Sequence, residues 1–417
     1  MTDVQEPSDP QPAVANDEPE PLPPVVPLDG IPDVLTDPED LQRAIETLVA
    51  GSGPVGVDAE RASGFRYGQR AYLVQFHRRG GGTWLIDPIA LPDLSALRAA
   101  LADTVWILHA ASQDVPCLRE VGLEPPEIFD TEVAARLLGR ERVGLGPLVE
   151  SELGLHLAKG HGAADWSQRP IPEDWRHYAA LDVEVLPDLY DRLRADLVAS
   201  GKTAWEREES ESVRTAPPPP PREDPWRRTS GLHKVRGRRN LATVRSLWLS
   251  RDELAQTKDM SPGRLLPDAA IVAAAVAQPA TYDELAAIPE FRKRGAVRNL
   301  RRWWRAVQES LTLPEDALPL PSLRSDSPPP PRLWRDRNPE AADRLDRARA
   351  AMTALSEEHQ LPVENLLTPD FVRRLAWQPP EPLRRETVAE ELTSRGARAW
   401  QIDMVTGPLT EALTTEP

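Results

Sequence analysis

The sequence of 417 residues predicts an α/β domain with a mixed sheet, followed by all-helical domains. Short apolar runs that are typical of buried strands lie between about residues 52 and 109, and helical spacing of apolar residues continues from there to about residue 204. Strands that lead into helices indicate a mixed sheet covered by helices. Proline clusters then separate two further segments, in which the periodicity is helical only.

Composition divides the chain into six parts, because 417 residues are too many for one ordinary core. The first part, residues 1–27, is acidic and proline-rich with few large apolar residues, so we expect a disordered tail. An α/β domain is predicted at residues 28–205, followed by a linker at 206–230. A helical domain is predicted at 231–312, a proline-rich linker at 313–335 and a second helical domain at 336–413.

The α/β domain is predicted to begin with a helix near Asp37 and Pro38, which form a typical helix start. Three strands in a meander are predicted next, at residues 55–60, 71–76 and 83–87. A helix at 94–101 and a fourth strand at 105–109 follow them. The next clearly patterned element is helical and spans residues 173–193.

Two carboxylates end the first of these strands. Asp58 and Glu60 are two residues apart, so on a strand their side chains project from the same face. Unpaired carboxylates near a core are costly, and a divalent metal ion with oxygen ligands is the natural cation to lie between them. The motif Asp-x-Glu after an apolar run is common, however, and alone it is weak evidence for a metal site.

Further polar residues occur at positions where they could join this pair. Asp114 follows the fourth strand, where Ser112 is predicted to cap a new helix; alone, it is an acid favoured by the helix dipole. His109, at the strand end, reads equally well as a core histidine. Tyr178 and Asp182 are four residues apart and share one face of a helix, although a buried tyrosine and a surface acid would also fit.

In combination, these residues form an ordered set that resembles the DEDD superfamily of 3′→5′ exonucleases, in the branch with a tyrosine and specifically the ribonuclease D family. The resemblance covers about residues 28–200 and departs from the family at Ala59 and Arg61, where a threonine and an aromatic residue are usual near the terminal nucleotide. The motifs that carry it are Asp58-Ala59-Glu60, His109 to Asp114, Phe129-Asp130-Thr131, Gly144-Leu145 with Leu148, Asp165-Trp166 with Arg169-Pro170, and Tyr178 to Val183.

The resemblance implies a ribonuclease H-like mixed sheet flanked by helices, and hydrolysis of RNA from the 3′ end to nucleoside 5′-monophosphates. It implies two divalent ions, Mg²⁺ or Mn²⁺, with Asp58 bridging both, Glu60 and Asp182 at one, and Asp114 at the other. Tyr178 would orient the attacking water, because a tyrosine with a pKa near ~10 is a poor base at pH 7. His109, Gln113 and Lys159 would support the site or position the substrate.

The implied substrates are tRNA precursors or other structured RNA 3′ ends. Two alternatives remain open at this stage: a 3′→5′ DNA exonuclease, because nothing in the motif detects a 2′-hydroxyl, and a non-catalytic RNA-binding scaffold with a nuclease fold. The presence of all four carboxylates and of Tyr178 argues against the scaffold.

The net charge of −16 disguises a basic segment. From Trp226 to Ser310 there are 17 Lys and Arg and 8 Asp and Glu, a net charge of +9 that leaves −25 for the remainder. This segment resembles the HRDC domain, a helical module that ribonuclease D shares with some helicases, at Leu265 to Asp268 and Pro279 to Leu285. The expected RNA-binding residues, for which a merely solvated helix face is the alternative, are Lys234, Arg236, Arg238, Arg239, Arg292, Lys293, Arg294, Arg298, Arg301 and Arg302.

The last helical segment repeats part of this pattern, since Pro362 to Pro369 resembles Met260 to Asp268. We therefore predict a diverged second HRDC-like domain. The single cysteine, Cys117, allows no internal disulfide, no signal peptide is evident and no apolar run approaches ~20 residues. We expect a cytoplasmic protein with no membrane partner and no obligate protein partner.

Overall fold

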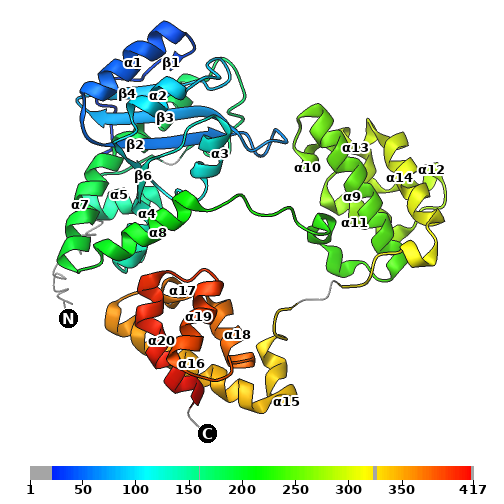
Figure 1. Ribbon diagram of the computed structural model, residues 1–417. Helices are drawn as coiled ribbons and strands as arrows, with labels where there is room; N and C mark the ends of the chain where they lie inside the picture. Colours follow the sequence, from blue (N-terminus) through cyan, green and yellow to red (C-terminus); the bar gives the residue numbers. More distant parts are fainter. Residues whose placement is uncertain (1–20, 159, 323–325, 415–417) are drawn as a thin grey trace, which may run out of the picture.

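The structure is a computed structural model that describes residues 21–158, 160–322 and 326–414. It consists of an α/β domain and two helical domains, which are separate lobes in Figure 1. Within the described residues, no helix has both the length and the apolar character needed to span a membrane.

The α/β domain contains one six-stranded sheet in the order β1-β4-β3-β2-β5-β6 (Figure 1). The antiparallel pairs β2–β3 and β3–β4 confirm the predicted meander, whereas β5 and β6 add to β2 in parallel. The prediction missed β1 and β6, which are too short to show a pattern. The strands are β1 (Val34–Leu35), β2 (Ser52–Arg61), β3 (Ala71–Arg79), β4 (Gly82–Ile86), β5 (Val105–Leu108) and β6 (Glu127–Asp130).

Helices cover both faces of the sheet. One face packs on α1 (Pro38–Ala50), α2 (Ser95–Ala100) and α3 (Asp114–Glu120) through alternate strand residues such as Val55 and Val57. Asp37 caps α1 as predicted, because its carboxylate accepts a hydrogen bond from the backbone N–H of Glu39. The opposite face is covered by α4 (Thr131–Leu137), α5 (Leu145–Leu153), α6 (Glu173–Glu184) and α7 (Leu186–Ala199).

Two segments differ from the prediction at the ends of this domain. Residues 21–27, expected in the disordered tail, lie against the domain, because the N–H of Val25 donates to the carbonyl of His156 at 2.9 Å. The rest of the predicted tail lies outside the described residues. Residues 206–215, expected in a linker, belong to α8 (Thr203–Thr215), which packs on β6 and buries Glu206 and Ser210. The sequence of α8 hides this role, since its buried face is polar.

The first helical domain is built around a long helix, α9 (Arg238–Lys258). Thr281 caps α12 as predicted, by accepting a hydrogen bond from the N–H of Glu284. The last predicted helix is in fact two helices, α13 and α14, because Arg298 and Asn299 interrupt it. The other helices are α10 (Pro262–Leu265), α11 (Asp268–Ala277), α12 (Tyr282–Ala287), α13 (Arg294–Val297) and α14 (Leu300–Thr312).

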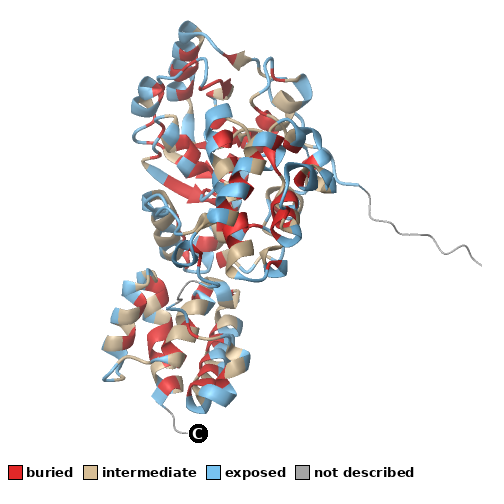
Figure 2. Cartoon of the chain, turned by 90° about the vertical axis from the view of Figure 1, so that its right-hand side faces the viewer, coloured by how far each residue is buried: buried red, intermediate tan, exposed pale blue. Residues whose placement is uncertain are grey.

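The second helical domain begins in a similar way. Its helix α16 (Pro339–His359) has 21 residues, as α9 has, and each ends at a residue with positive φ, Gln360 or Asp259. A four-residue helix follows in both domains. Figure 2 shows buried residues on the inner faces of the C-terminal helices and exposed ones outside. Its other helices are α15 (Trp334–Arg337), α17 (Val363–Leu366), α18 (Pro369–Trp377), α19 (Arg385–Ser394) and α20 (Ala399–Thr414).

The C-terminal domain packs on the helices of the α/β domain, and both contribute to one apolar cluster. The rings of Trp205 and Trp400 stack with centroids 4.9 Å apart. The buried ammonium of Lys202 donates to the carbonyls of Leu137 and His359, each at 2.8 Å, and so joins the ends of α4 and α16.

The first helical domain contacts the loop 62–70, which follows β2. The N–H of Ser261 donates to the carbonyl of Phe65 at 2.9 Å, and the hydroxyl of Tyr67 donates to Asp252 at 3.1 Å. This loop therefore links the helical domain to the strand that carries Asp58 and Glu60.

Candidate active site

The structure brings all five predicted catalytic side chains into one cavity of about 220 Å³. Asp58 and Glu60 come from β2, Asp114 from the start of α3, and Tyr178 and Asp182 from α6. His109 and Gln113 also line the cavity, whereas Lys159 lies outside the described residues. Positions up to 124 residues apart in the sequence thus meet at one place.

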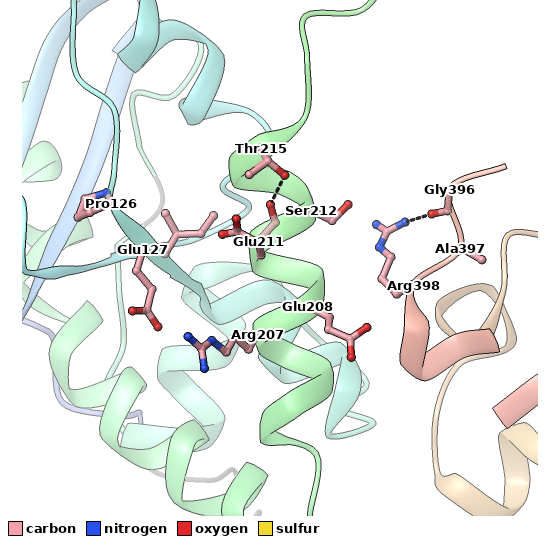
Figure 3. A pocket seen from close by; sticks show the side chains of 11 residues that line it. Pro126, Glu127, Arg207, Glu208, Glu211, Ser212, Thr215, Gly396, Ala397 and Arg398 are labelled. Carbon is pink, nitrogen blue, oxygen red and sulfur yellow. Dashed lines mark hydrogen bonds between the residues drawn. The ribbon is translucent and has the colours of Figure 1, made fainter. Parts of the chain in front are cut away.

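A larger cavity of about 730 Å³ lies elsewhere, between α8 and the residues before α20 (Figure 3). Its charged lining is mixed in sign, with Arg207 and Arg398 beside Glu127, Glu208 and Glu211. None of the five predicted catalytic residues lines it, so cavity size does not locate the active site.

The carboxylates in the smaller cavity fit a divalent cation. One oxygen from each of Asp58, Glu60 and Asp182 lies within 4.8 Å of the other two. Glu60, Asp114 and Asp182 are almost fully buried, and such hard oxygen donors suit Mg²⁺ or Mn²⁺. The acidic cluster therefore indicates that the protein uses divalent metal.

Electrostatics lead to the same conclusion. Burial raises the pKa of Asp58, Glu60, Asp114 and Asp182 above the ordinary values of these groups. The negative charge of Asp58 raises the pKa of the other three further. Without a cation, the ionised carboxylates repel one another in a buried cavity, where they are poorly solvated.

A glycine allows the strand and the helix to approach closely. A Cβ atom on Gly56 would lie 2.6 Å from the carbonyl oxygen of Val183, which a real side chain could not tolerate. Gly56 is two residues before Asp58, on the same face of β2, and Val183 directly follows Asp182. The missing side chain at position 56 therefore brings Asp182 within reach of Asp58.

Asp130 positions the loop that carries Asp114. Its buried carboxylate accepts hydrogen bonds from the N–H groups of Ala110 and Ala111 and from two N–H groups in the first turn of α4. Ala110 has a φ of 58°, a left-handed conformation that non-glycine residues seldom adopt. The predicted cap by Ser112 is wrong: α3 begins after Gln113, without a side-chain cap.

His109 is held from the same side. Its Nδ1 lies 2.9 Å from the hydroxyl of Thr131, which also donates to the carbonyl of Leu108. Burial lowers the pKa of His109 to about 4, so the imidazole is neutral at pH 7. The Phe-Asp-Thr stretch at residues 129–131 thus supports the site from the neighbouring strand.

Tyr178 is enclosed by a loop and keeps its proton. Burial, followed by the charges of Asp182 and Glu60, raises the pKa of its hydroxyl above the ordinary value. A Cβ atom on Gly160 would lie 2.8 Å from the Tyr178 ring, and the ring of His161 meets it edge-on at 5.9 Å. The hydroxyl, which lines the cavity together with Asp182, is therefore a donor rather than a base.

The sequence analysis assigned no role to Gln75. This residue pairs with Asp58 across β2 and β3, so both side chains lie on the same face of the sheet. It is fully buried, and neither atom of its amide has a hydrogen-bond partner among the described residues. A single polar residue within the apolar run 71–76 was the signal that could have identified it.

The predicted RNA-binding residues fall into two groups. Arg238, Arg239 and Arg302 serve the helical domain itself: the first two donate to carbonyls at residues 310–319, and Arg302 bonds Ser250 and Glu253. The other seven are exposed, and their side chains make no hydrogen bond or ion pair with the described residues; they are Lys234, Arg236, Arg292, Lys293, Arg294, Arg298 and Arg301.

Three family models match the chain. A 3′-5′ exonuclease model matches residues 32–198, an HRDC domain model matches 240–307, and a model described as the 3′ to 5′ exonuclease C-terminal domain matches 327–413. The last of these covers the segment for which a diverged second HRDC-like domain is predicted.

Relatives and solved structures agree with these matches. Ribonuclease D of Granulibacter bethesdensis is 30% identical to this chain, and the match covers 83% of this chain and 86% of the relative. Ribonuclease D of Gluconacetobacter diazotrophicus is 31% identical, and the match covers 84% of this chain and 88% of the relative. A protein from Bifidobacterium adolescentis is 37% identical with a TM-score of 0.87, over 95% of this chain and 100% of its own. Escherichia coli RNase D, described as an exoribonuclease involved in structured RNA processing, is 25% identical with a TM-score of 0.65, over 92% and 99%.

An exonuclease domain with four converging carboxylates is thus followed by an HRDC domain and a helical C-terminal domain. The chain belongs to the ribonuclease D family and is a 3′→5′ exoribonuclease.

Proposed function

We propose that this exoribonuclease cleaves with two divalent ions, Mg²⁺ or Mn²⁺, held by Asp58, Glu60, Asp114 and Asp182. The observation that carries the proposal is the convergence of these four carboxylates and Tyr178 on one cavity. Two such ions, when bound, would supply a reactive water at neutral pH and stabilise charge on the leaving oxygen.

The carboxylates divide into two groups. Asp58, Glu60 and Asp182 form the tight cluster, whereas Asp114 lines the same cavity without belonging to that cluster. This arrangement favours Asp58 as the residue shared by both ions, with Glu60 and Asp182 at one and Asp114 at the other.

Tyr178 donates a hydrogen bond to the attacking water and fixes its direction. Because the pKa of its hydroxyl is raised, it keeps its proton and does not act as a general base. The neutral His109, held by Thr131, supports the Asp114 loop, and Gln113 lines the cavity beside it. For Lys159 the supporting role stays a prediction.

The substrates that we propose are structured RNA 3′ ends such as tRNA precursors. The similarity to Escherichia coli RNase D supports this class, and the seven exposed basic residues of the HRDC domain supply a surface for the RNA backbone. We further propose a cytoplasmic location, consistent with the single, buried Cys117, and a division into exonuclease, HRDC and C-terminal domains joined near residues 216–224 and 320–330.

The test uses 5′-labelled single-stranded RNA and matched DNA with Mg²⁺, Mn²⁺ or chelator, for the wild type and for Asp182→Asn. We expect a ladder that shortens from the 3′ end, requires metal and is lost in the variant. A preference for DNA would support the DNA exonuclease, and binding without any cleavage would support the scaffold. Precursor tRNA compared with unstructured RNA then tests the substrate class.

A further inference from the structure

Arg61 ends the strand that carries Asp58 and Glu60. Because neighbouring side chains alternate between faces, Arg61 follows Val57 and Ala59 onto the face of the sheet that packs on α3. There one Nη of Arg61 lies 3.4 Å from Oε1 of Gln113, the residue directly before α3.

Arg61 therefore reaches Gln113, which lines the carboxylate cavity and directly precedes Asp114. Burial raises the pKa of Asp58, Glu60 and Asp114, and the positive charge of Arg61 acts on all three in the opposite direction. The positive charge of Arg61 thus acts electrostatically on all three carboxylates without direct contact.

The guanidinium has donors to spare. Among the described residues, its hydrogen bond to Gln113 is the only one, and no carboxylate oxygen lies within 4.0 Å of its nitrogens. Arg169, by contrast, is fully engaged by Asp87 and by the carbonyls of Tyr72 and Trp166. A guanidinium has five N–H donors in a planar fork, which suits two oxygens of a phosphate.

We propose that Arg61 is a substrate-positioning residue that binds a non-bridging phosphate oxygen at the 3′ end of the RNA. This inference rests on the proposed function, since it needs RNA in the carboxylate cavity. The carboxylates repel a phosphodiester, and a cation beside them with unused donors opposes that repulsion. Because the side chain at this position is a guanidinium, its hold on the last nucleotide is ionic.

The experiment compares Arg61→Gln and Arg61→Lys with Arg70→Gln, on a 5′-labelled RNA tetranucleotide too short to reach the HRDC domain. Arg70 is a matched control, because it is exposed, lies over the ring of Tyr72 at 5.1 Å and makes no hydrogen bond to a described residue that lines the cavity. For Arg61→Gln we expect a KM about 10-fold higher, a kcat within about 3-fold, and a salt slope of kcat/KM smaller by about 0.7, which is one phosphate contact. For Arg61→Lys we expect the wild-type salt slope of kcat/KM, together with a KM that lies between the values of the wild type and of Arg61→Gln.

Three results would overturn the proposal: an unchanged KM and salt slope in Arg61→Gln, the same change in Arg70→Gln, or a loss confined to kcat. The last would mean that Arg61 acts only on the carboxylates. Mn²⁺ binding by calorimetry serves as the control for the metal site, and it should be no weaker in Arg61→Gln. Failure of the proposed function would look different, because the wild type itself would then show no chelator-sensitive cleavage.

Discussion

The carboxylate of Asp130 accepts a hydrogen bond from the N–H of Ala111 at 2.8 Å, which ties the end of β6 to the loop that follows β5. Asp130 is 2% exposed, and the candidate metal ligand Asp114 lies three positions after Ala111. The position of one carboxylate in the active site thus depends on a second carboxylate outside it.

Asp130→Asn should weaken catalysis without removing a metal ligand. The amide has one acceptor oxygen in place of two, so some of the four N–H groups that Asp130 satisfies lose their partner. We expect kcat to fall about 10-fold and the free energy of unfolding to fall by about 1–3 kcal/mol. Cleavage assays and urea denaturation measure both; full activity would show that the Asp114 loop holds its shape unaided.

Tyr178→Phe removes the hydroxyl but keeps the ring against Gly160. We expect kcat to fall about 10²-fold, because the attacking water loses one orienting hydrogen bond, with Mn²⁺ affinity nearly unchanged. Asp182→Asn is the matched comparison, and it should lose both activity and Mn²⁺ affinity. Calorimetry separates the two variants, and equal loss of metal binding would contradict the role given to Tyr178.

Glu206 predicts a pH dependence of stability. Burial raises the pKa of this carboxyl to about 7, from an ordinary value of 4.5. The folded state then holds the proton more tightly than the unfolded state, so this contribution is fully present below pH 4.5 and is lost as the pH rises to about 7.

The measurement is urea denaturation of the wild type and Glu206→Gln between pH 4 and 8. From the pKa difference, we expect the free energy of unfolding of the wild type to fall relative to the variant by about 2–4 kcal/mol across this window. The amide cannot ionise, and it keeps the size needed beside Ser210. A constant difference between the two proteins would show that Glu206 titrates normally.

Lys202→Met should loosen the C-terminal domain. The variant leaves the carbonyls of Leu137 and His359 without their shared donor at a buried junction. We expect a loss of about 2–3 kcal/mol in the free energy of unfolding, and faster proteolysis between the domains. Lys258→Met, which removes an exposed lysine, is the control; equal behaviour of the two variants would exclude the linking role of Lys202.

The HRDC domain offers a test with matched arginines. Arg298→Gln combined with Arg301→Gln removes two exposed charges, and we expect about 10-fold weaker binding of long RNA in chelator, with a salt slope smaller by about 1.4. Arg302→Gln should leave the RNA affinity unchanged and lower stability, because Arg302 bonds Ser250 and Glu253. Fluorescence anisotropy with labelled RNA measures the affinities. If only Arg302→Gln bound RNA more weakly, Arg302 rather than Arg298 and Arg301 would be the RNA-binding residue.

The local spacing of the site residues could be predicted from the sequence, because it depends only on the periods of strands and helices. A period of two places Asp58 and Glu60 on one face of β2, and a step of four places Tyr178 and Asp182 on one face of α6. The meander, the helix at Asp37 and the cap at Thr281 also follow from short-range rules. Their grouping into one active site rested on resemblance to a family.

The features that the sequence analysis missed or got wrong depend on contacts between distant segments. The polar helix α8 has no apolar pattern, yet β6 buries its Glu206. Arg298 and Arg302 are indistinguishable as residues, and only the position of Glu253 and Ser250 on α9 separates them. Gln75 is visible as part of the site only once β3 lies beside β2.

By itself, the sequence determined which side chains share a face of each element, and through these motifs the family and its chemistry. Tertiary structure alone decided how close the elements come and where single side chains point. Gly56 admits α6 to within contact of β2, Asp130 holds the loop before Asp114, and the packing of α3 on the sheet brings Gln113 to Arg61. The physical reason is that these distances result from packing and hydrogen bonds between residues far apart in the chain, which no local period records.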